Sequence, residues 1–69
     1  MNLKDDGYPP VLLMADLCRV LRLHENTVYR RIAVGQVPAY RRLGRRYEWD
    51  RDDVQTWLCN RRAHLRKVG

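Results

Sequence analysis

One stretch of the chain, from His24 to Val34, limits the possible folds more than any other. Side chains on an α-helix follow one another at about 100° per residue, so Val28 and Ile32 would share one face of a helix here. The opposite face would be polar and basic, with groups that hydrogen-bond to base edges and phosphates. These side chains are Asn26, Thr27, Tyr29, Arg30 and Arg31. The pattern predicts a short helix that packs on one side and lies in a groove of DNA on the other, and the alternative is a face that is merely solvated.

The positive charge is concentrated in the second part of the chain. Residues 1–28 carry three cations and four anions, whereas residues 29–69 carry eleven cations and four anions. Twelve of the fourteen cations are arginines, whose planar guanidinium group suits bidentate contact with phosphate or guanine. This asymmetry indicates that a polyanion binds on one side of the molecule. A basic surface that serves only solubility is the alternative, but such a surface usually spreads its charge and includes more lysine.

The length of 69 residues allows one domain at most, with a small hydrophobic core. A chain of this size has little material for the walls of an enzyme cleft. The sequence also shows no paired-carboxylate, Ser/His or Cys/His arrangement for catalysis. We therefore expect a binding module, not an enzyme, and no small-molecule substrate.

The two cysteines, Cys18 and Cys59, form no CxxC pair. His24 and His64 do not complete a zinc-binding spacing with them, so we expect no metal, no cofactor and no disulfide. Cys18 should act as a small apolar side chain on a buried face. The longest apolar run, Val11–Ala15, is too short to span a membrane, and no signal peptide is visible. These features predict a cytoplasmic protein.

The sequence pattern of residues 1–24 predicts an arm followed by a helix and a turn. Residues 1–10 are polar and end in two prolines, which favours an extended arm, and its aspartates would keep it away from phosphate. Residues 13–21 predict a helix whose apolar stripe consists of Leu13, Leu17, Val20 and Leu21. Arg22, Leu23 and His24 would form the turn of a helix-turn-helix. Leu23 should insert into the core, and His24 should be an exposed N-cap.

The middle of the chain predicts a β-hairpin. Gly35 should end the second helix in a left-handed conformation, and two short strands should follow over residues 39–43 and 46–49. The side chains expected to face the core are Leu43, Tyr47 and Trp49. Four arginines in this hairpin would repel one another unless an anion lies nearby, so we interpret the hairpin as a DNA-contacting wing. Its expected DNA-binding residues are Tyr40, Arg41, Arg42, Arg45 and Arg46.

The last part of the chain predicts a helix and a basic tail. Asp50 is a good N-cap, and Asp52 and Asp53 would lie at the positive end of the helix dipole. The buried stripe would consist of Val54, Trp57 and Leu58. The tail either extends this helix or stays disordered until DNA or a neighbouring protomer orders it. The tail residues expected to contact DNA or a partner are Arg61, Arg62, Arg66 and Lys67.

Together these elements predict a mainly α-helical fold with a small β-hairpin, a winged helix-turn-helix. The domain would span residues 11–60, between the extended arm of residues 1–10 and the basic tail of residues 61–69. A single module of this size buries only ~600–1,000 Å² on DNA, and no heptad run is long enough for a coiled-coil dimer. We therefore expect a monomer in solution that assembles cooperatively on neighbouring DNA sites.

The order of these segments resembles the excisionase-like, MerR-type winged-helix family, which includes phage excisionases and AlpA-type regulators. The resemblance covers Leu12 to Leu58. After an apolar first helix, it is carried by the segments Thr27-Val28-Tyr29-Arg30, Gly35-Gln36-Val37-Pro38-Ala39, Leu43-Gly44-Arg45-Arg46-Tyr47 and Asp52-Asp53-Val54-Gln55-Thr56-Trp57-Leu58. Three positions depart from the family pattern. Leu13 and His24 replace the usual Ser or Thr helix caps, and Arg22 replaces the usual glycine of the turn.

The resemblance implies a small basic protein of bacteria or their mobile elements, located in the cytoplasm and associated with DNA. Many members of the family are recombination directionality factors, which bind several adjacent sites, bend the DNA and help an integrase to excise the element. Others are transcription activators or repressors. The implied partners are therefore double-stranded DNA, an integrase and further copies of the chain on the same DNA.

Our main hypothesis is a DNA-binding architectural protein that performs no chemistry. Asn26 would pair with adenine and Arg30 with guanine in the major groove. The phosphate contacts on this helix would be Thr27, Tyr29 and Arg31. Glu25 either accepts a hydrogen bond from cytosine or stabilises the helix N-terminus, and the second role is favoured. The closest alternative is a transcription regulator, followed by a protein-interaction adaptor with a basic tail and by an RNA-binding protein.

Overall fold

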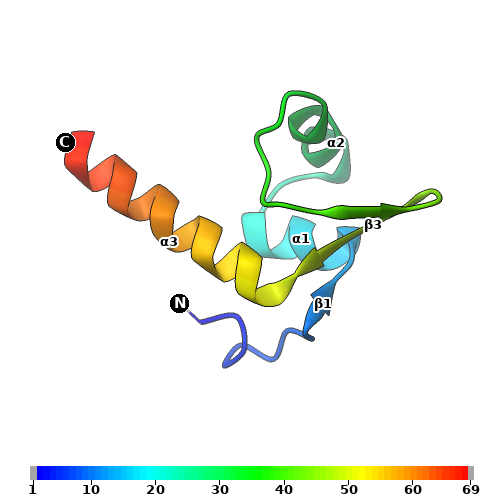
Figure 1. Ribbon diagram of the computed structural model, residues 1–69, viewed down its shortest axis with the longest axis horizontal. Coiled ribbons are helices and arrows are strands. Elements are labelled where there is room, and N and C mark those ends of the chain that lie inside the picture. The colour runs from blue at the N-terminus through cyan, green and yellow to red at the C-terminus, as the bar shows by residue number, and fades with distance from the viewer. Residues whose placement is uncertain (1, 69) are drawn as a thin grey trace.

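The computed structural model describes the backbone of residues 2–68 and the side chains of residues 2–60. Within this part, the chain forms three helices and three short strands (Figure 1). In chain order they are β1 (Val11–Leu12), α1 (Met14–Leu21), α2 (Glu25–Ala33), β2 (Arg41–Leu43), β3 (Arg46–Asp50) and α3 (Arg51–Val68). The pair α1–α2 followed by the hairpin β2–β3 makes the fold a winged helix-turn-helix, as predicted.

Strand β3 lies in the middle of an antiparallel sheet with the strand order β1–β3–β2. Leu12 lies opposite Trp49 across the first pair of strands, and Arg42 lies opposite Tyr47 across the second. Because side chains alternate between the two faces of a strand, all four share the inner face of the sheet. Helices α1 and α3 pack against β3, and the core forms between these elements. Its buried apolar side chains are Leu3, Leu12, Leu17, Val20, Val28, Trp49 and Val54.

Helix α1 begins one residue later than the sequence predicts. Leu17 and Val20 are buried and Leu21 is half-buried, but the Leu13 side chain is 41% exposed. Leu13 is the N-cap and has an extended backbone (φ −98°, ψ 178°). Its prediction as part of the apolar stripe is wrong because a cap residue does not follow the helical period. Asp16 Oδ2 accepts a hydrogen bond from the Leu13 N–H (3.2 Å), which is the half of a capping box that needs no polar side chain at the N-cap.

The turn between α1 and α2 places Arg22 in the left-handed region, at φ 56° and ψ 44°. The Leu23 N–H then donates to the Cys18 carbonyl (3.1 Å) and satisfies one of the free carbonyls at the end of α1. Leu23 is half-buried and packs against the core, which confirms its predicted place. Among the non-glycine residues that the structure describes, Arg22 alone has a positive φ. The backbone here favours the glycine that Arg22 replaces in the family pattern.

Helix α2 is held at both ends by local hydrogen bonds. His24 is the N-cap, and its Nδ1 accepts the backbone N–H two residues later (3.1 Å). At the other end, Gly35 has φ 73°, and its N–H donates to the Ile32 carbonyl (3.2 Å). The Gln36 N–H donates to the Arg31 carbonyl (2.8 Å). The last two bonds form a Schellman motif, so the left-handed conformation predicted for Gly35 is confirmed.

The hairpin corrects a prediction about its two faces. Strand β2 starts at Arg41, and a two-residue Gly-Arg turn pairs Leu43 with Arg46. Because residues on one strand alternate in direction, this register turns Leu43 to the outer face, away from Tyr47 and Trp49. The Leu43 side chain is 53% exposed, so its predicted place in the core is wrong. Tyr47 is half-buried and Trp49 is fully buried, as predicted.

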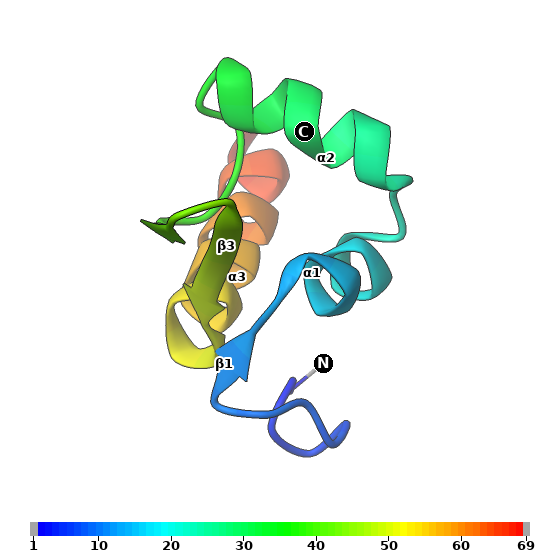
Figure 2. The same cartoon turned by 90° about the vertical axis from the view of Figure 1, so that its right-hand side faces the viewer.

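The segment before β1 does not form the extended arm that its prolines predict (Figure 2). Residues 3–7 form turns, in which the Tyr8 N–H donates to the Leu3 carbonyl (3.1 Å). The Leu3 side chain is fully buried, and its N–H donates to Gln55 Oε1 in α3 (2.8 Å). Arg51 Nη1 donates to the Tyr8 carbonyl (2.8 Å). The segment folds over the start of α3 because burial of Leu3 is favourable, a long-range contact that local propensities do not reveal.

Helix α3 starts directly after β3, with two aspartates in its first turn, as predicted. Val54 is buried, and Trp57 and Leu58 are half-buried. The helical backbone continues through residue 61 to Val68, so the first of the two alternatives for the tail is the one observed. The tail residues that lie outside the described side chains are Arg61, Arg62, Arg66 and Lys67. Their contacts therefore stay a prediction.

Replacement of Arg22 by glycine should stabilise the protein. The left-handed region disfavours a residue with a Cβ atom by about 1–2 kcal/mol, and the greater freedom of glycine in the unfolded chain removes part of the gain. We expect Arg22→Gly to raise the free energy of unfolding in urea by roughly 0.5–1 kcal/mol. Arg19→Gly is the matched control, because it removes the same charge from an exposed site inside α1 and should lower stability by about 1 kcal/mol. A loss of stability in Arg22→Gly would contradict the backbone assignment.

Truncation of Leu3 should show that the N-terminal segment belongs to the domain. Because the side chain is fully buried, we expect Leu3→Ala to lower the free energy of unfolding by about 2–3 kcal/mol. The neighbouring Lys4 is exposed, so Lys4→Ala should change stability by less than about 0.5 kcal/mol. Equal unfolding transitions for the two variants in thermal or urea denaturation would mean that the segment is a free arm after all.

Candidate nucleic-acid interface

Helix α2 lies at the opposite end of the molecule from the N-terminal segment, as both ribbon views show (Figures 1 and 2). Val28 is fully buried and Ile32 packs against the core, so the helix is attached through the apolar face that the sequence predicts. The predicted DNA-contacting side chains occupy the solvent side. Those that are exposed are Glu25, Asn26, Tyr29 and Arg30, and those that are half-buried are Thr27 and Arg31.

The charged groups of α2 are arranged to suit the helix dipole and leave its cations available. Arg30 and Arg31 lie in the last turn, and within the described side chains neither forms an ion pair with a carboxylate. Glu25 lies in the first turn, where a carboxylate stabilises the positive end of the helix. Burial and, as a smaller cause, the charge of Glu25 raise the pKa of the Cys18 thiol. The position of Glu25 fits the structural role that the sequence analysis favours.

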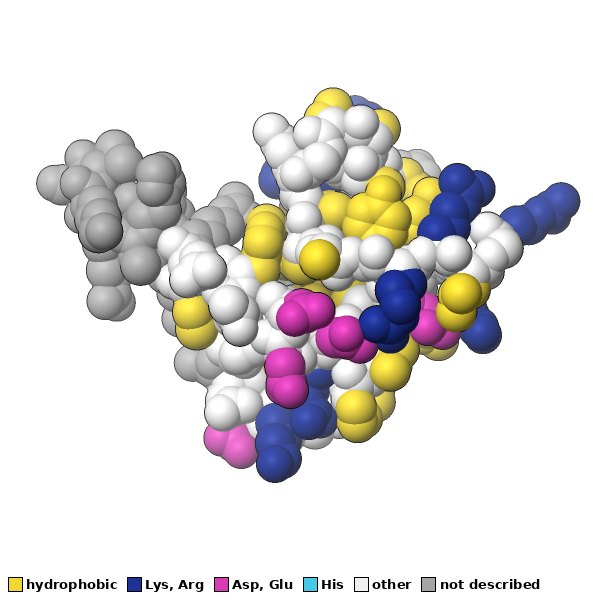
Figure 3. All heavy atoms as spheres, viewed as in Figure 1, with side chains coloured by type: hydrophobic (Ala, Val, Ile, Leu, Met, Phe, Trp, Pro, Cys, Tyr) yellow, Lys and Arg dark blue, Asp and Glu magenta, His cyan; other side chains and the backbone are white. Residues whose placement is uncertain are grey.

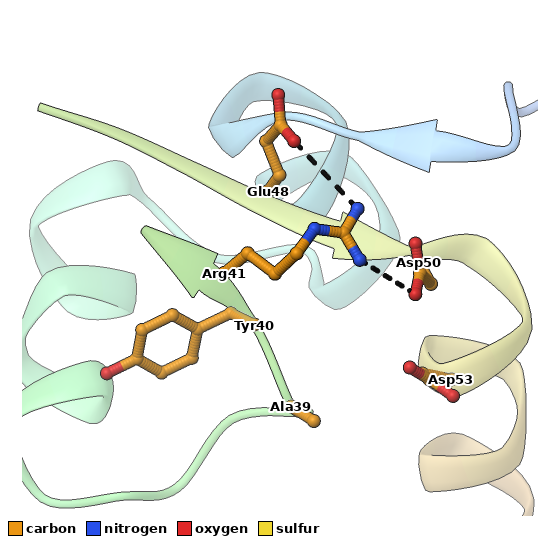
Figure 4. Close-up of a pocket in the computed structure, with 6 residues that line it drawn as sticks. All are labelled: Ala39, Tyr40, Arg41, Glu48, Asp50 and Asp53. Atoms are coloured by element: carbon orange, nitrogen blue, oxygen red, sulfur yellow. Dashed lines mark hydrogen bonds and ion pairs between the residues drawn. The ribbon is translucent and has the colours of Figure 1, made fainter. Parts of the chain in front are cut away.

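Part of the arginine cluster in the wing carries its own counter-ions. Arg41 Nη1 lies 2.9 Å from Asp50 Oδ2, and its Nη2 lies 3.8 Å from Glu48 Oε1 (Figure 4). Arg46 Nε lies 3.5 Å from Glu48 Oε2. The hydrogen bond between Arg41 and Asp50 lowers the pKa of the Asp50 carboxyl and raises the pKa of the Arg41 guanidinium, because it stabilises the charged form of each group. The anion that this cluster requires is therefore supplied by β3 itself.

The other two wing arginines have no such partner. Arg42 Nε donates to the Gly44 carbonyl (3.1 Å), and its guanidinium carbon lies 5.5 Å from the centroid of the Tyr47 ring. Arg45 is exposed in the turn. Within the described side chains, neither arginine forms an ion pair with a carboxylate. The wing thus presents two guanidinium groups that are available for an external anion and two that would first have to leave an internal partner.

A cluster of aromatic rings lies between α2 and the hairpin. The centroid of the Tyr47 ring is 5.9 Å from that of Tyr29 and 5.4 Å from that of Tyr40. Trp49 stacks on Tyr47 at 6.1 Å. Trp49 is fully buried, whereas Tyr29 and Tyr40 are each 42% exposed. Tyr40, a predicted wing contact, therefore packs partly on the hairpin and presents the remainder of its side chain to solvent.

The outer face of the sheet is unsuited to DNA. Acidic side chains gather there near the start of α3 (Figure 3). A small hollow of about 90 Å³ on this face is lined by Ala39, Tyr40, Arg41, Glu48, Asp50 and Asp53 (Figure 4). Three of these six residues are carboxylates, which repel phosphate. This face is therefore less suited to a nucleic acid than α2 and the tip of the wing, where the arginines without a carboxylate partner among the described side chains lie.

The sequence analysis missed the acidic partners of the wing. Glu48 and Asp50 alternate with apolar residues on β3, and with a two-residue turn Arg41 lies directly opposite Glu48. Opposite charges at such cross-strand positions attract one another. The signal was therefore present in the sequence. The Gly-Arg turn fixes the register of β2 against β3, and this register determines which charged side chains lie opposite one another.

The described residues show few features of other kinds of site. Among them, no three His, Cys, Asp or Glu side chains gather as a metal site requires. In the same part of the chain, no helix is long and apolar enough to cross a membrane. Cys18 and Cys59 are both free thiols. What the surface does offer is hydrogen-bonding groups and guanidinium groups on α2 and the wing.

Comparison with known families identifies the kind of domain. Residues 14–62 match the model of the helix-turn-helix domain family. This range begins with α1, contains α2 and the hairpin, and ends inside α3. The chain matches no curated protein and no solved structure. Because the match covers most of the chain and both helices of the motif, the chain belongs to the helix-turn-helix domain family and is a DNA-binding protein of that family.

Proposed function

We propose that the protein is a sequence-specific architectural protein of the excisionase kind, a recombination directionality factor. Copies that are monomeric in solution line up on adjacent sites, bend the DNA and help an integrase to excise a mobile element. The observation that carries this proposal is a set of guanidinium groups on both α2 and the wing that form no ion pair with a carboxylate among the side chains of residues 2–60. They belong to Arg30, Arg31, Arg42 and Arg45. Such a set suits simultaneous contact with a major groove and the neighbouring backbone.

In this proposal α2 lies in the major groove. Asn26 pairs with adenine and Arg30 with guanine, because each side chain offers two hydrogen-bonding groups in one plane. Both are exposed one helical turn apart, which supports their common role. The phosphate contacts that fix the helix in the groove are Thr27, Tyr29 and Arg31. Glu25 remains at the helix N-terminus and contributes to the stability of α2.

The wing contacts the adjacent minor groove or backbone. Arg45 in the turn and Arg42 on β2 make this contact. Arg41 and Arg46 contribute less, because a phosphate must compete with carboxylates that are already in place. Tyr40 adds the exposed part of its side chain. The tail cations that contact DNA, a neighbouring copy or the integrase are Arg61, Arg62, Arg66 and Lys67.

A transcription regulator that uses the same surface is the second candidate, because both roles need the same DNA contacts. The experiment that separates them combines the protein with the integrase encoded nearest to its gene and a plasmid that carries the attachment sites. A directionality factor should increase the excised product and suppress the reverse reaction. If excision is unchanged while the output of a neighbouring promoter responds to the protein, the regulatory role is the correct one.

Single substitutions should separate base reading from phosphate contact. On a duplex selected from a random pool by the unchanged protein, we expect Arg30→Ala to weaken binding by about 1–3 kcal/mol and to relax the preference at one or two base pairs. Arg45→Ala should weaken binding to selected and random duplexes alike. It should also reduce the slope of log K against log salt by about 1, because one phosphate contact is lost.

Arg41→Ala is the matched control for Arg45→Ala. Both variants lose one positive charge from the hairpin, but Arg41 is already paired with Asp50 at 2.9 Å. We therefore expect a smaller loss of affinity and a smaller change in salt slope for Arg41→Ala. Fluorescence anisotropy at several salt concentrations measures both. Equal losses for the two variants would show that internal ion pairs do not decide which wing arginines meet DNA.

A further inference from the structure

We propose that Tyr47 is a positioning residue that joins α2 to the wing, so that both contact DNA as one rigid unit. This inference rests on the proposed function, because it requires α2 and the wing to lie on the same duplex. It gives Tyr47 a role beyond the place in the core that the sequence predicts for it.

Outside the shared core, α2 and the hairpin both pack against α1, and the hairpin has a further support in α3 through strand β3. A direct link between them is the contact of Tyr29 with Tyr47, whose ring centroids lie 5.9 Å apart at an interplanar angle of 69°. Aromatic pairs favour this edge-to-face geometry. The Tyr47 ring therefore restrains the orientation of α2 relative to the wing.

The same ring holds one arginine of the wing. Arg42 lies directly opposite Tyr47, and its guanidinium carbon is 5.5 Å from the ring centroid. Arg42 Nε is fixed by the Gly44 carbonyl at 3.1 Å, while its two Nη groups make no hydrogen bond within the described residues. Trp49 anchors the arrangement, because it is fully buried and stacks on Tyr47 at an angle of 28°. The core, the reading helix and the wing thus meet at one phenol ring.

A rigid connection changes how the two contacts add. Once α2 lies in the major groove, a rigidly attached wing is already beside its own part of the duplex. Its contact with DNA is then intramolecular, and the wing loses little conformational entropy when it binds. Without the Tyr47 ring, each contact keeps its own chemistry, but the wing adds less to the affinity of the helix. If Tyr47 only filled the core, its loss would lower stability and leave the contribution of the wing unchanged.

The experiment compares two duplexes. The long duplex is selected from a random pool by the unchanged protein. The short duplex lacks the base pairs whose protection from hydroxyl radicals is lost in Arg45→Ala, so it offers nothing to the wing. The ratio of the two dissociation constants measures what the wing adds. We expect the unchanged protein to bind the long duplex about 10-fold more tightly or better.

Tyr47→Leu should bring this ratio close to unity while the affinity for the short duplex stays the same. Tyr47→Phe keeps the ring and should keep the ratio. Tyr29→Ala removes the other ring of the Tyr29–Tyr47 contact, at an exposed position on α2, and should also lower the ratio. Its control, Tyr29→Phe, removes only the hydroxyl group that we propose contacts phosphate, so it should weaken both duplexes alike and leave the ratio unchanged.

A ratio that Tyr47→Leu and Tyr29→Ala both leave unchanged would overturn the inference. If circular dichroism shows that Tyr47→Leu does not fold, the result for Tyr29→Ala decides. A ratio near unity for the unchanged protein would also overturn it, and the reading role of α2 would stand. A failure of sequence-specific binding, on which the proposed function depends, gives a different result, because the unchanged protein would then bind selected and random duplexes equally well.

Discussion

The packing of Trp49 in the middle of β3 is the interaction on which the other contacts depend. Its side chain is fully buried, Leu12 lies opposite it on β1, and Tyr47 stacks beside it. Helices α1 and α3 both pack against this strand. One large aromatic side chain buries about 150–250 Å², which is a substantial share of the core in so small a domain. Because the strand that carries Trp49 is also one arm of the hairpin, the direction of the wing follows from the packing of the core.

The distribution of charge then determines which side of the domain attracts DNA. Residues 29–69 carry most of the positive charge, but Glu48 and Asp50 offset Arg41 and Arg46 on the outer face of the sheet. The arginine of each ion pair is exposed to solvent, which limits what the pair contributes to stability. Their effect is on the electric field, since they remove attraction from the outer face and leave it at α2 and at the wing tip. If all four wing arginines were unpaired, phosphate could bind to either face of the hairpin, and the orientation of the domain on DNA would be less specific.

Features that depend on nearby residues could be predicted from the sequence, and features that depend on distant ones could not. The Val28 face, the His24 cap and the left-handed Gly35 are each determined within about two helical turns, and all three are observed. The exposure of Leu43 depends on the register of the hairpin strands, a local signal that the sequence analysis did not use. The burial of Leu3 depends on a contact with α3 more than fifty residues away, which no local pattern reveals. The acidic partners of the wing arginines lie within nine residues of them and follow from the same register, so the sequence contained this signal although the sequence analysis did not use it. The DNA contacts on α2 and the wing stay predictions, since they involve atoms of the ligand.

The three departures from the family pattern lie at helix ends, and the structure accommodates them in different ways. Leu13 lacks a side-chain acceptor for the first helical N–H groups, but its own N–H is satisfied by the Asp16 carboxylate. His24 supplies Nδ1 in place of a hydroxyl oxygen, and this nitrogen accepts a hydrogen bond only when it carries no proton. Arg22 receives no such compensation from its backbone, which stays left-handed. His24 directly precedes α2 and Arg22 lies three residues before it, so capping and strain in this turn act on the same helix start that we propose enters the major groove. If α2 enters the major groove as we propose, the stability of the turn and the recognition of DNA are coupled through the first residues of α2.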